Sequence, residues 1–454
     1  MFRPSGPKRR WDRAHLRRAA RAILAAGLEA ADPARLVRRH LRVDEGVLAV
    51  AGVKHRFGPG RRLVLIAAGK AGSTMARAAE DVLGDRISEG LVVDTTAAAP
   101  PLRHCRVHVA RHPLPDERGR RAADEIEALA RGLGADDLLL LLVSGGASAL
   151  LPAPVPGISL DDKVAVTSLL LRSGATIGEL NTVRKHLSRL KGGGLARAAY
   201  PARVVALVLS DVVGDDLSVI ASGPTVPDAS TYAQALDVLR ARQVLGAVPR
   251  PVRRHLEAGV AGRVEETPKA RDRVFRRVRT RIVGSNRWTV EAAAQEARRQ
   301  GLRALTLTTF LEGEARDAGL LAGALAKELV LRRRPLAPPA CLILGGETTV
   351  TVRGRGKGGR NQEIALAAAV AIAGLERTLV VALATDGSDG PTDAAGGIVD
   401  GRTLQRAEGL GLDARAALAD NSSHDFLERV GDLLVTGPTN TNVNDLLFVF
   451  SFGR

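Results

Sequence analysis

The sequence has few of the residues on which several classes of protein depend. Only two cysteines, Cys105 and Cys341, occur among 454 residues. That number excludes a disulfide framework or a cysteine metal site and suits a reducing cytoplasm. Aromatic residues make up 3% of the chain, so few side chains could stack on the bases of a single-stranded nucleic acid. No apolar run approaches the roughly 18 residues that a membrane span needs, and we expect no membrane partner.

The charge balance is basic, but it does not by itself indicate a nucleic-acid partner. The chain carries 66 Lys and Arg against 49 Asp and Glu, a net charge of +17, which favours polyanions in general. The excess is spread along the chain, and neither a zinc-finger spacing nor an RNP motif is present. We therefore expect no nucleic-acid partner, although a basic non-enzymatic binder stays as a rival hypothesis.

The N-terminal segment, residues 1–24, is rich in arginine but has no apolar core followed by a cleavage site. A secretory signal is therefore not expected. The segment is compatible with a mitochondrial presequence, and we interpret it instead as the first surface helix of a cytoplasmic protein.

A short apolar strand, a small-residue turn and an Ala-rich helix recur along the chain. Residues 61–83, 136–151 and 279–301 show this order, and residues 203–216 are a strand that ends in an acidic turn. Uninterrupted Val, Leu and Ile runs predict strands that are buried on both faces. Strands of this kind alternating with helices predict an α/β protein with mostly parallel sheets. Ligands in such folds sit beyond the carboxyl ends of the strands.

A length of 454 residues predicts two or three domains. Residues 230–278 are polar, include several prolines and lack a long apolar run, so we expect the main boundary there. A weaker break is expected at residues 331–340, just before the strand that contains Cys341.

Two turns between a strand and a helix predict anion binding. Ala67–Ser73 ends one strand and opens a helix, whose free N–H groups would face an anion close to Lys70. Leu142–Leu151 has the same geometry with added hydroxyl groups and predicts a phosphate nest. Neither turn is a Walker A loop, and a serine nucleophile is disfavoured because no GxSxG pattern is present. The residues of the predicted nest are Ser144, Gly145, Gly146, Ala147 and Ser148.

A basic helix at Asn181–Ala196 ends in three glycines. Its cations Arg184, Lys185, Arg189 and Lys191 are spaced to share roughly one helical face. Charged helices are usually just solvated, but the exit through Lys191, Gly192 and Gly193 suggests a contact with an anion.

Aspartates follow two of the predicted strands. Asp211 ends one strand, and Asp386, Asp389 and Asp393 follow another. Mg²⁺ is usually held by one or two carboxylates together with substrate phosphates, so these positions favour magnesium. The second cluster lacks the final Glu of an EF-hand loop, and Asp389 could instead form a turn with Gly390. No dinucleotide fingerprint is convincing, and together these features indicate phosphoryl transfer.

The stretch from Arg353 to Arg360 contains four cations and four glycines, and an apolar helical pattern follows. We interpret Arg353–Gly359 as a mobile approach to Arg360 at the start of the helix. On this interpretation the loop closes over one small anion and does not grip a polyanion.

Eight collinear motifs together resemble the glycerate 2-kinases with a C-terminal MOFRL domain, some members of which are labelled hydroxypyruvate reductase. The likeness covers nearly the whole chain. The motifs are AAGKA, ARHPLPDE, LVSGGASALL, NTVRKHLSRLKGGGLA, LSDVVGDDLSVIASGPT, GGETTVTVRGRGKGGRNQE, ATDGSDGPTDAAGG and TGPTNTNVNDL.

The resemblance implies a Rossmann-like αβα domain at residues 10–262 and a smaller α/β domain at 275–454. The MOFRL region would span about 338–450, and the active site would lie in the cleft between the two domains. It also implies phosphorylation of D-glycerate at its 2-hydroxyl with ATP and Mg²⁺, by a monomer or homodimer. The lysine and arginine that the family holds to matter for activity correspond to Lys70 and Arg360.

The roles that follow are hypotheses that rest on this resemblance. Arg360 would clamp the carboxylate of glycerate, and Lys70 would approach the transferring phosphoryl group. The Ser144–Ser148 turn, Lys191 to Gly194 and Glu347 would contact the nucleotide phosphates. Asp211 is expected to bind magnesium, with Asp386 or Glu347 as second metal ligand. Either Asp211 or Asp386 would accept the proton of the attacking hydroxyl. An NAD(P)-dependent hydroxypyruvate reductase is the alternative.

Overall fold

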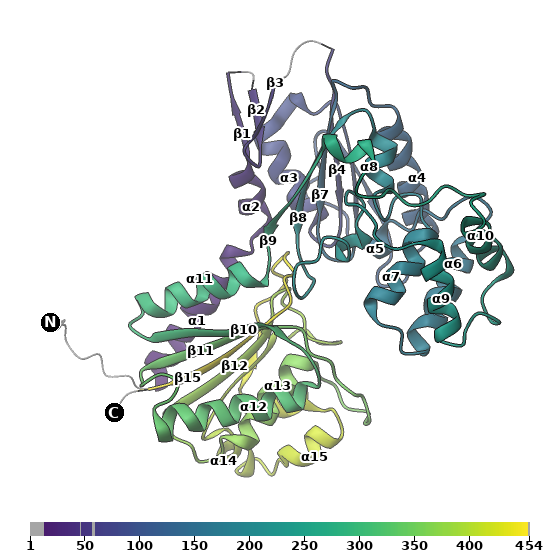
Figure 1. The fold of residues 1–454 in the computed structure, drawn as a ribbon. Helices are drawn as coiled ribbons and strands as arrows, with labels where there is room; N and C mark the ends of the chain where they lie inside the picture. Colours follow the sequence, from purple (N-terminus) through teal and green to yellow (C-terminus); the bar gives the residue numbers. More distant parts are fainter. Residues whose placement is uncertain (1–12, 46, 57–59, 453–454) are drawn as a thin grey trace. The chain divides into compact units, whose positions relative to one another are not determined.

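The structure is a computed structural model that describes residues 13–45, 47–56 and 60–452. The described chain forms two compact units (Figure 1). The N-terminal unit consists of Pro33–Ser285 with Asn440–Asn442, and the C-terminal unit contains the described residues up to Asp32, Asn286–Thr439 and those from Val443 onward. The first twelve residues of the predicted surface helix lie outside the described residues.

The N-terminal unit contains a three-stranded sheet, a six-stranded sheet and the helices around them. Its elements are α2 (Pro33–His40), β1 (Leu41–Asp44), β2 (Val47–Val50), β3 (Val53–Arg56), β4 (Leu63–Ala68), α3 (Gly72–Leu83), β5 (Glu89–Asp94), β6 (Cys105–Val109), α4 (Glu117–Arg131), β7 (Leu138–Val143), α5 (Ala147–Leu150), α6 (Leu160–Arg172), α7 (Ile177–His186), α8 (Gly194–Ala199), β8 (Arg203–Leu209), α9 (Tyr232–Ala241), α10 (Arg250–Val260) and β9 (Val278–Gly284).

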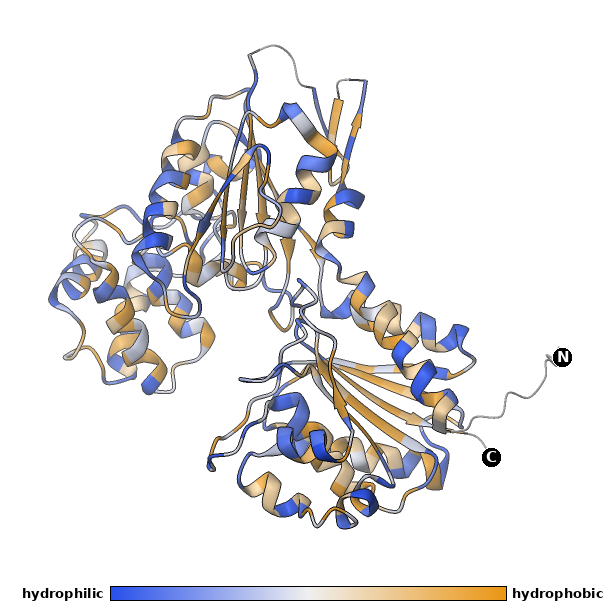
Figure 2. Cartoon of the chain, turned by 180° about the vertical axis from the view of Figure 1, so that it is seen from behind, coloured by the Kyte–Doolittle hydropathy of each residue, from blue (hydrophilic) through white to orange (hydrophobic). Residues whose placement is uncertain are grey.

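The six-stranded sheet has the order β6-β5-β4-β7-β8-β9, and all of its strand pairs are parallel. Every residue of the central strands β4 and β7 is buried, which is why both read as continuous apolar runs in the sequence. Alternate side chains pack against α4, α5 and α8 in one large core cluster. The strands accordingly appear as apolar ribbons in Figure 2. The predicted α/β class with a parallel sheet is confirmed for this unit.

Helices α6, α7, α9 and α10 form a second, helical core in the N-terminal unit. Buried residues such as Tyr232, Leu239, Val252 and Leu256 connect α9 and α10 to it. The segment 230–278, which we expected to be the domain boundary, is therefore packed inside this unit. Its apolar residues were not recognised because they recur at helical spacing and never form a continuous run.

The C-terminal unit is built around a second six-stranded sheet. Its elements are α1 (Arg13–Ala30), α11 (Asn286–Arg299), β10 (Arg303–Leu311), α12 (Ala315–Lys327), β11 (Ala340–Gly346), α13 (Arg360–Ala371), β12 (Thr378–Ala384), β13 (Gly396–Asp400), α14 (Thr403–Glu408), α15 (Ala414–Ala419), α16 (Ser423–Arg429), β14 (Leu433–Leu434) and β15 (Asp445–Ser451).

The sheet of the C-terminal unit has the order β10-β11-β15-β12-β13-β14 and is mostly antiparallel. Only β10 and β11 pair in parallel, whereas β15 runs antiparallel between β11 and β12. The prediction of a mostly parallel sheet is wrong here. Core clusters on both faces bury the strands as completely as in a parallel sheet, so the apolar runs could not reveal the strand direction.

Helix α1 packs in the C-terminal unit, although the sequence placed it in the first domain. Its apolar side chains, among them Leu16 and Ile23, lie in one core cluster with Val290 of α11 and Phe448 of β15. Arg17 extends from the same helix to Asp432, with 2.8 Å between Nη2 and Oδ1. The chain thus contributes its first described helix to the unit formed mainly by its second half.

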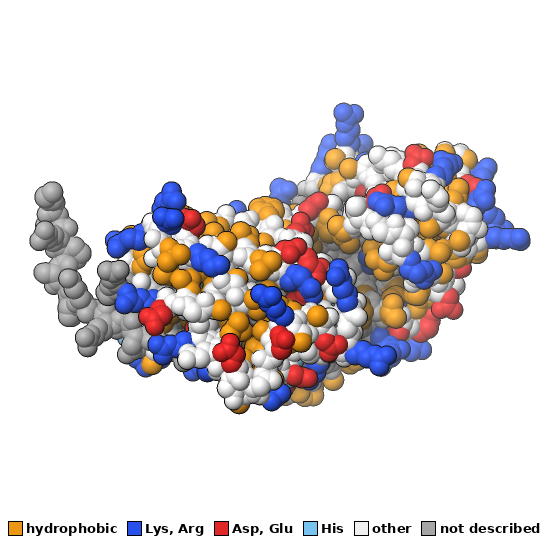
Figure 3. Space-filling model, turned by 90° about the horizontal axis from the view of Figure 1, so that it is seen from below, with side chains coloured by type: hydrophobic (Ala, Val, Ile, Leu, Met, Phe, Trp, Pro, Cys, Tyr) orange, Lys and Arg blue, Asp and Glu red, His pale blue; other side chains and the backbone are white. Residues whose placement is uncertain are grey.

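Surface charge is mixed. In Figure 3, Lys and Arg side chains are dispersed over the visible face, with Asp and Glu among them. Cys105 and Cys341 are both free and buried. Among the helices of the described residues, none is long and apolar enough to cross a membrane.

Candidate active site

The two predicted anion-binding turns interlock at the carboxyl ends of β4 and β7, which are neighbours in the N-terminal sheet. The Lys70 amide donates to the Gly145 carbonyl at 2.9 Å, and the Ala71 amide donates to Ser144 Oγ at 3.0 Å. Gly69 has a φ of +125°, and a Cβ there would lie 2.2 Å from Ser144 Oγ. Only glycine permits both the conformation and the approach, so one turn fixes the other.

The Lys70 side chain leaves this junction at the start of α3 and lies against Gly146. A Cβ on Gly146 would sit 3.4 Å from Lys70 Cγ and 3.1 Å from His112 Cδ2. Burial, and then the charge of Lys70, lower the pKa of His112. Lys70 and His112 therefore flank the predicted nest, and His112 was not identified from the sequence as a site residue.

Asp211 lies over the same nest. It follows Ser210 at the end of β8, next to β7 in the sheet, and a Cβ on Gly145 would be 2.3 Å from Asp211 Oδ2. The carboxylate thus packs directly on the glycine backbone. Of the predicted residues, Lys70, Gly145 and Asp211 meet at one edge of one sheet, as the strand-end argument requires.

Ser148, in the short helix α5, is contacted by two cations from the basic segment Asn181–Ala196. Arg184 Nη2 lies 2.6 Å from Ser148 Oγ, and Lys191 Nζ donates to the Ser148 carbonyl at 2.7 Å. The same hydroxyl lies 2.8 Å from Ser222 Oγ. Burial, followed by the charges of Arg184 and Lys163, holds the pKa of Lys191 well below its ordinary value. Two basic side chains thus converge on Ser148, and burial favours the neutral form of Lys191.

The other cations of this segment are neutralised within the fold. Lys185 Nζ lies 3.4 Å from Asp228 Oδ1, and Arg189 pairs with Asp124 and Glu127. Of the four cations that we expected on one face, two therefore form structural ion pairs and two contact Ser148.

Gly192 and Gly193 donate their amides to protein carbonyls. Their partners are the carbonyls of Ser222, at 2.9 Å, and Gly223, at 2.7 Å. Both glycines have positive φ, so their evident role is to turn the chain tightly after Lys191. Their predicted contact with phosphate stays a prediction, and Lys191 is the residue of this turn that reaches the nest.

Lys163 of α6 is a further buried cation near this cluster and was missed in the sequence. Its Nζ donates to the Pro152 carbonyl, and its side chain is almost fully buried. Burial, then the charges of Arg184 and Arg189, lower its pKa to about 7. A lysine in an amphipathic helix gives no sequence signal of burial, because its long side chain usually extends to solvent.

The burial of Lys163 makes stability depend on pH in a defined window. Its pKa is about 7 in the folded protein against 10.5 ordinarily, so between these values the unfolded chain binds more protons and stability rises with pH. Lys163→Met removes this dependence. We expect the stability of Lys163→Met relative to the unaltered protein to fall by about 2–3 kcal/mol between pH 7 and pH 9.5.

Urea unfolding followed by circular dichroism at the two pH values measures this difference. The exposed Lys327, replaced by Met, is the control and should show the same relative stability at both pH values. A Lys163→Met variant whose relative stability is equal at pH 7 and pH 9.5 would contradict the assignment.

Arg360 is the centre of a second polar group, in the C-terminal unit. It is the first residue of α13, and Nε and Nη2 contact the two oxygens of Asp445 at 2.5 and 3.0 Å. Nη1 lies 2.8 Å from Glu347 Oε1. Burial alone would lower the pKa of Arg360, but the hydrogen bonds and charge of Asp445 raise it on balance. Burial raises the pKa of Asp445 to about 7 even beside this partner.

Asp389 has a structural role at the start of α13, which differs from both sequence interpretations, a metal ligand or a turn with Gly390. It lies buried at the start of α13, where Oδ1 accepts from the Asn361 amide at 3.1 Å and Oδ2 from the Gln362 amide at 2.8 Å. These bonds satisfy amides that the helix leaves unpaired at its N-terminus. Asp386 is only partly buried, and its Oδ1 accepts from the Ser388 amide at 3.0 Å.

The Gly-rich loop before Arg360 is pinned, which corrects its interpretation as a mobile segment. Arg353 and Arg355 donate their amides to Asn421 Oδ1 at 2.7 Å and Asp420 Oδ1 at 3.0 Å. A Cβ on Gly354 or Gly356 would lie 2.3–2.4 Å from residues 420–422. The glycines permit close backbone approach, and the sequence could not distinguish that use from flexibility.

Asp445 was missed as a site residue, although it lies in TGPTNTNVNDL, one of the eight motifs of the sequence analysis. The signal was present in the chain, since an acid directly preceding the apolar run of β15 occupies the first position of a buried strand. Predicted site residues thus fall into two groups. Lys70, Ser144, Gly145, Gly146, Ala147, Ser148, Lys191 and Asp211 lie in the N-terminal unit, and Glu347, Arg360 and Asp386 lie in the C-terminal unit. An active site in a cleft between them stays a prediction.

Two family models match the chain, one in its N-terminal part and one in its C-terminal part. Residues 19–257 match a family model described as a domain of unknown function, DUF4147, and residues 340–445 match the MOFRL family. A relative from Pyrococcus horikoshii named glycerate 2-kinase is 44% identical over 94% of this chain and 95% of its own. A relative from Agrobacterium vitis, 42% identical over 96% of this chain and 94% of its own, has a provisional hydroxypyruvate reductase name.

The fold is also similar to a solved structure. The crystal structure of glycerate kinase from Thermotoga maritima superposes with a TM-score of 0.86 at 41% identity, and the match covers 96% of this chain and all of that one. The curated D-glycerate 2-kinase of that organism is 44% identical over 85% of this chain and 90% of its own. With matching domains in the same order and such identity over nearly its whole length, the chain belongs to the glycerate 2-kinase family with a C-terminal MOFRL domain.

Proposed function

We propose that the protein transfers the γ-phosphoryl group of ATP to the 2-hydroxyl of D-glycerate, giving 2-phosphoglycerate and ADP. The observation that carries the proposal is the interlocked pair of turns at the ends of β4 and β7. They place the Lys70 side chain, a glycine nest and the Asp211 carboxylate together. The relatives named glycerate 2-kinase supply the substrate.

The nest and its cations suit a chain of phosphates. The amide groups at the start of α5 and the positive end of α3 favour negative charge. Lys70 is exposed at this point and carries a compact charge on a flexible stem, which suits the moving γ-phosphoryl group. Arg184, partly buried beside Ser148, adds positive charge in a region that water screens poorly.

The residues present also fit a magnesium ion. A carboxylate that lies directly on the glycine nest, as Asp211 does, is the hard oxygen ligand that Mg²⁺ takes beside substrate phosphates. Asp386, partly buried in the C-terminal unit, is the second candidate ligand. When bound, the ion would neutralise charge on the phosphates. We assign Asp211 to hold the metal or to accept the hydroxyl proton, the two roles that its position allows.

Arg360 retains capacity for the carboxylate of glycerate. A guanidinium has five N–H donors, and Asp445 and Glu347 account for three of them. One N–H on each terminal nitrogen is left to form a paired contact with a carboxylate. Asp445 fixes the plane of the guanidinium, so the group is oriented before substrate binds.

One assay separates this function from the reductase alternative. The purified protein is supplied with D-glycerate, ATP and Mg²⁺, or with hydroxypyruvate and NADH, and ³¹P NMR identifies the product of the first reaction. We expect ADP and 2-phosphoglycerate in the first mixture and no NADH loss in the second. Formation of 3-phosphoglycerate would contradict the regiochemistry, and NADH loss without ATP turnover would favour the reductase. The absence of a convincing dinucleotide fingerprint supports the kinase.

A further inference from the structure

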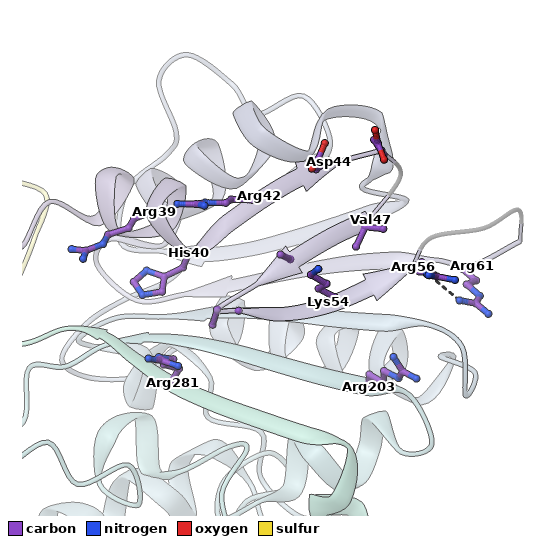
Figure 4. Close-up of a pocket in the computed structure, with 14 residues that line it drawn as sticks. Arg39, His40, Arg42, Asp44, Val47, Lys54, Arg56, Arg61, Arg203 and Arg281 are labelled. Atoms are coloured by element: carbon purple, nitrogen blue, oxygen red, sulfur yellow. Dashed lines mark hydrogen bonds between the residues drawn. The ribbon is translucent and has the colours of Figure 1, made fainter.

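The N-terminal unit contains a second basic cavity that the proposed reaction does not use. It is open, has a volume of about 1460 Å³, and lies between the three-stranded sheet and the β8–β9 side of the large sheet (Figure 4). Lys54 extends from β3, whereas Arg203 and Arg281 extend from β8 and β9. None of the predicted active-site residues lines it.

The lining is strongly basic and comes from separate parts of the sequence. Asp44 and Glu45 are its only two acidic residues among the fourteen that line it within the described chain. The basic lining residues are Arg39, His40, Arg42, Lys54, Arg56, Arg61, Arg203 and Arg281. Six of them lie within residues 39–61, and the fold brings Arg203 and Arg281 of the large sheet against this stretch.

Most of these cations lack the partners that arginines elsewhere in this unit have. Arg118, Arg240 and Arg253 are about half exposed, and each lies 2.8–2.9 Å from a carboxylate. In the cavity, Arg61 is 3.7 Å from the exposed Asp136. Within the described residues, six cavity cations have no carboxylate within 4.0 Å. These are Arg39, Arg42, Lys54, Arg56, Arg203 and Arg281.

Ordinary structural roles explain only part of this set. Arg39 lies in the last turn of α2, where a cation favours the helix dipole. Arg281 lies on β9, an edge strand that charge protects from aggregation. Lys54 and Arg56 lie on β3, an edge strand of the three-stranded sheet, so the same reason extends to them. Neither reason applies to Arg203, which starts β8 inside the large sheet. The field of Arg203 is also felt nearby, because burial and then that arginine lower the pKa of His55.

The lining indicates the chemistry of the ligand. Tryptophan, tyrosine and phenylalanine are absent from the described lining residues, so bases of a single-stranded nucleic acid would have no stacking platform. The cavity far exceeds the size of one phosphate and falls above the usual range for drug-sized ligands. We propose that this cavity binds a linear polyphosphate anion, either free inorganic polyphosphate or the phosphate chain of a nucleotide.

Calorimetric titration with inorganic tripolyphosphate, at low salt and without magnesium, tests the proposal. The cavity variant combines Lys54→Gln, Arg203→Gln and Arg281→Gln. The control combines Arg118→Gln, Arg240→Gln and Arg253→Gln, which removes the same charge from paired arginines. We expect binding to weaken by about tenfold or more in the cavity variant and by less than about threefold in the control, since one exposed charge contact contributes about two- to fivefold.

A third variant, Lys70→Ala, separates this cavity from the active site. Tripolyphosphate binding that survives Lys70→Ala but not the cavity substitutions supports the proposal. Equal losses in the cavity variant and the control would show a general charge effect and overturn it. Loss in Lys70→Ala alone would place the anion at the nest and also overturn it.

ATP titrated into Lys70→Ala identifies the source of the phosphate chain. An ATP affinity equal to that of tripolyphosphate indicates that the cavity recognises phosphates alone, and a tighter ATP affinity indicates that it recognises a nucleotide. Either result supports the proposal if the three cavity substitutions abolish the binding of ATP. A 20-base-pair DNA duplex that binds more than about tenfold tighter than tripolyphosphate, through the same residues, would overturn the proposal in favour of nucleic acid. Circular dichroism confirms that each variant is folded.

Discussion

Replacing Lys70 with Ala is expected to lower kcat with D-glycerate and ATP by about 10²–10⁴-fold while leaving the fold intact. The side chain is exposed and lies against Gly146 of the nest, where its charge would offset negative charge that develops on the transferring phosphoryl group. Its backbone amide makes the bond to Gly145, and alanine retains that bond. Steady-state kinetics and thermal unfolding of the same preparation measure both effects.

Two further variants make the Lys70 result specific. Lys327→Ala removes an exposed lysine of the C-terminal unit and should leave kcat within about twofold, because surface substitutions of this kind have small effects. Lys70→Arg should recover only part of the activity, since a planar guanidinium does not replace a flexible point charge at a phosphate. Near-normal turnover in Lys70→Ala would remove Lys70 from the reaction.

Arg360→Met is expected to reduce both stability and activity, and a second substitution should separate the two losses. The single change leaves Asp445 buried without its partner, at a cost of about 3–5 kcal/mol. Combining Arg360→Met with Asp445→Leu removes both charges and should recover most of this stability. Activity should stay about 10²–10⁴-fold low in the double variant, because the contact with the carboxylate of glycerate is still missing.

The melting temperature and kcat/KM of the three proteins measure this separation. Arg360→Lys is the matched control: it retains a charge beside Asp445 but cannot form the forked contact, so stability should recover more than activity. Recovery of activity together with stability in the double variant would show that Arg360 serves the fold alone.

The fold class could be predicted from the sequence because the central strands of both sheets are buried on both faces. Continuous apolar runs such as Leu138–Val143 identified these strands, and the turns after them identified the ligand-binding edge. The same property concealed the antiparallel course of β15, which is as apolar as any parallel strand. Direction depends on which strands lie side by side, and that is a long-range property of the chain.

The structure brings together the predicted turns of the candidate site, whose geometry depends on the backbone, whereas the sequence prediction missed a residue whose properties depend on burial. The junction of Gly69 and Ser144 requires small residues at fixed positions, which the motifs record. Lys163 matters because of what surrounds it, and a charged residue in an amphipathic helix does not reveal in sequence that it will be buried. The glycines from Gly354 to Gly359 were assigned flexibility because close packing and mobility require the same residue.

The position of helix α1 has a consequence for the order in which the protein can fold during synthesis. This helix is synthesised before the other described elements, yet the helix and strands that share its core cluster, such as α11 and β15, come from residues 286–451. Residues 33–285, which form nearly all of the N-terminal unit, are made before them, and domains generally fold as they emerge. Leu16, Ile23 and their neighbours therefore stay without α11 until residues 286–299 have been made. A surface of that kind is where a chaperone would bind the nascent chain.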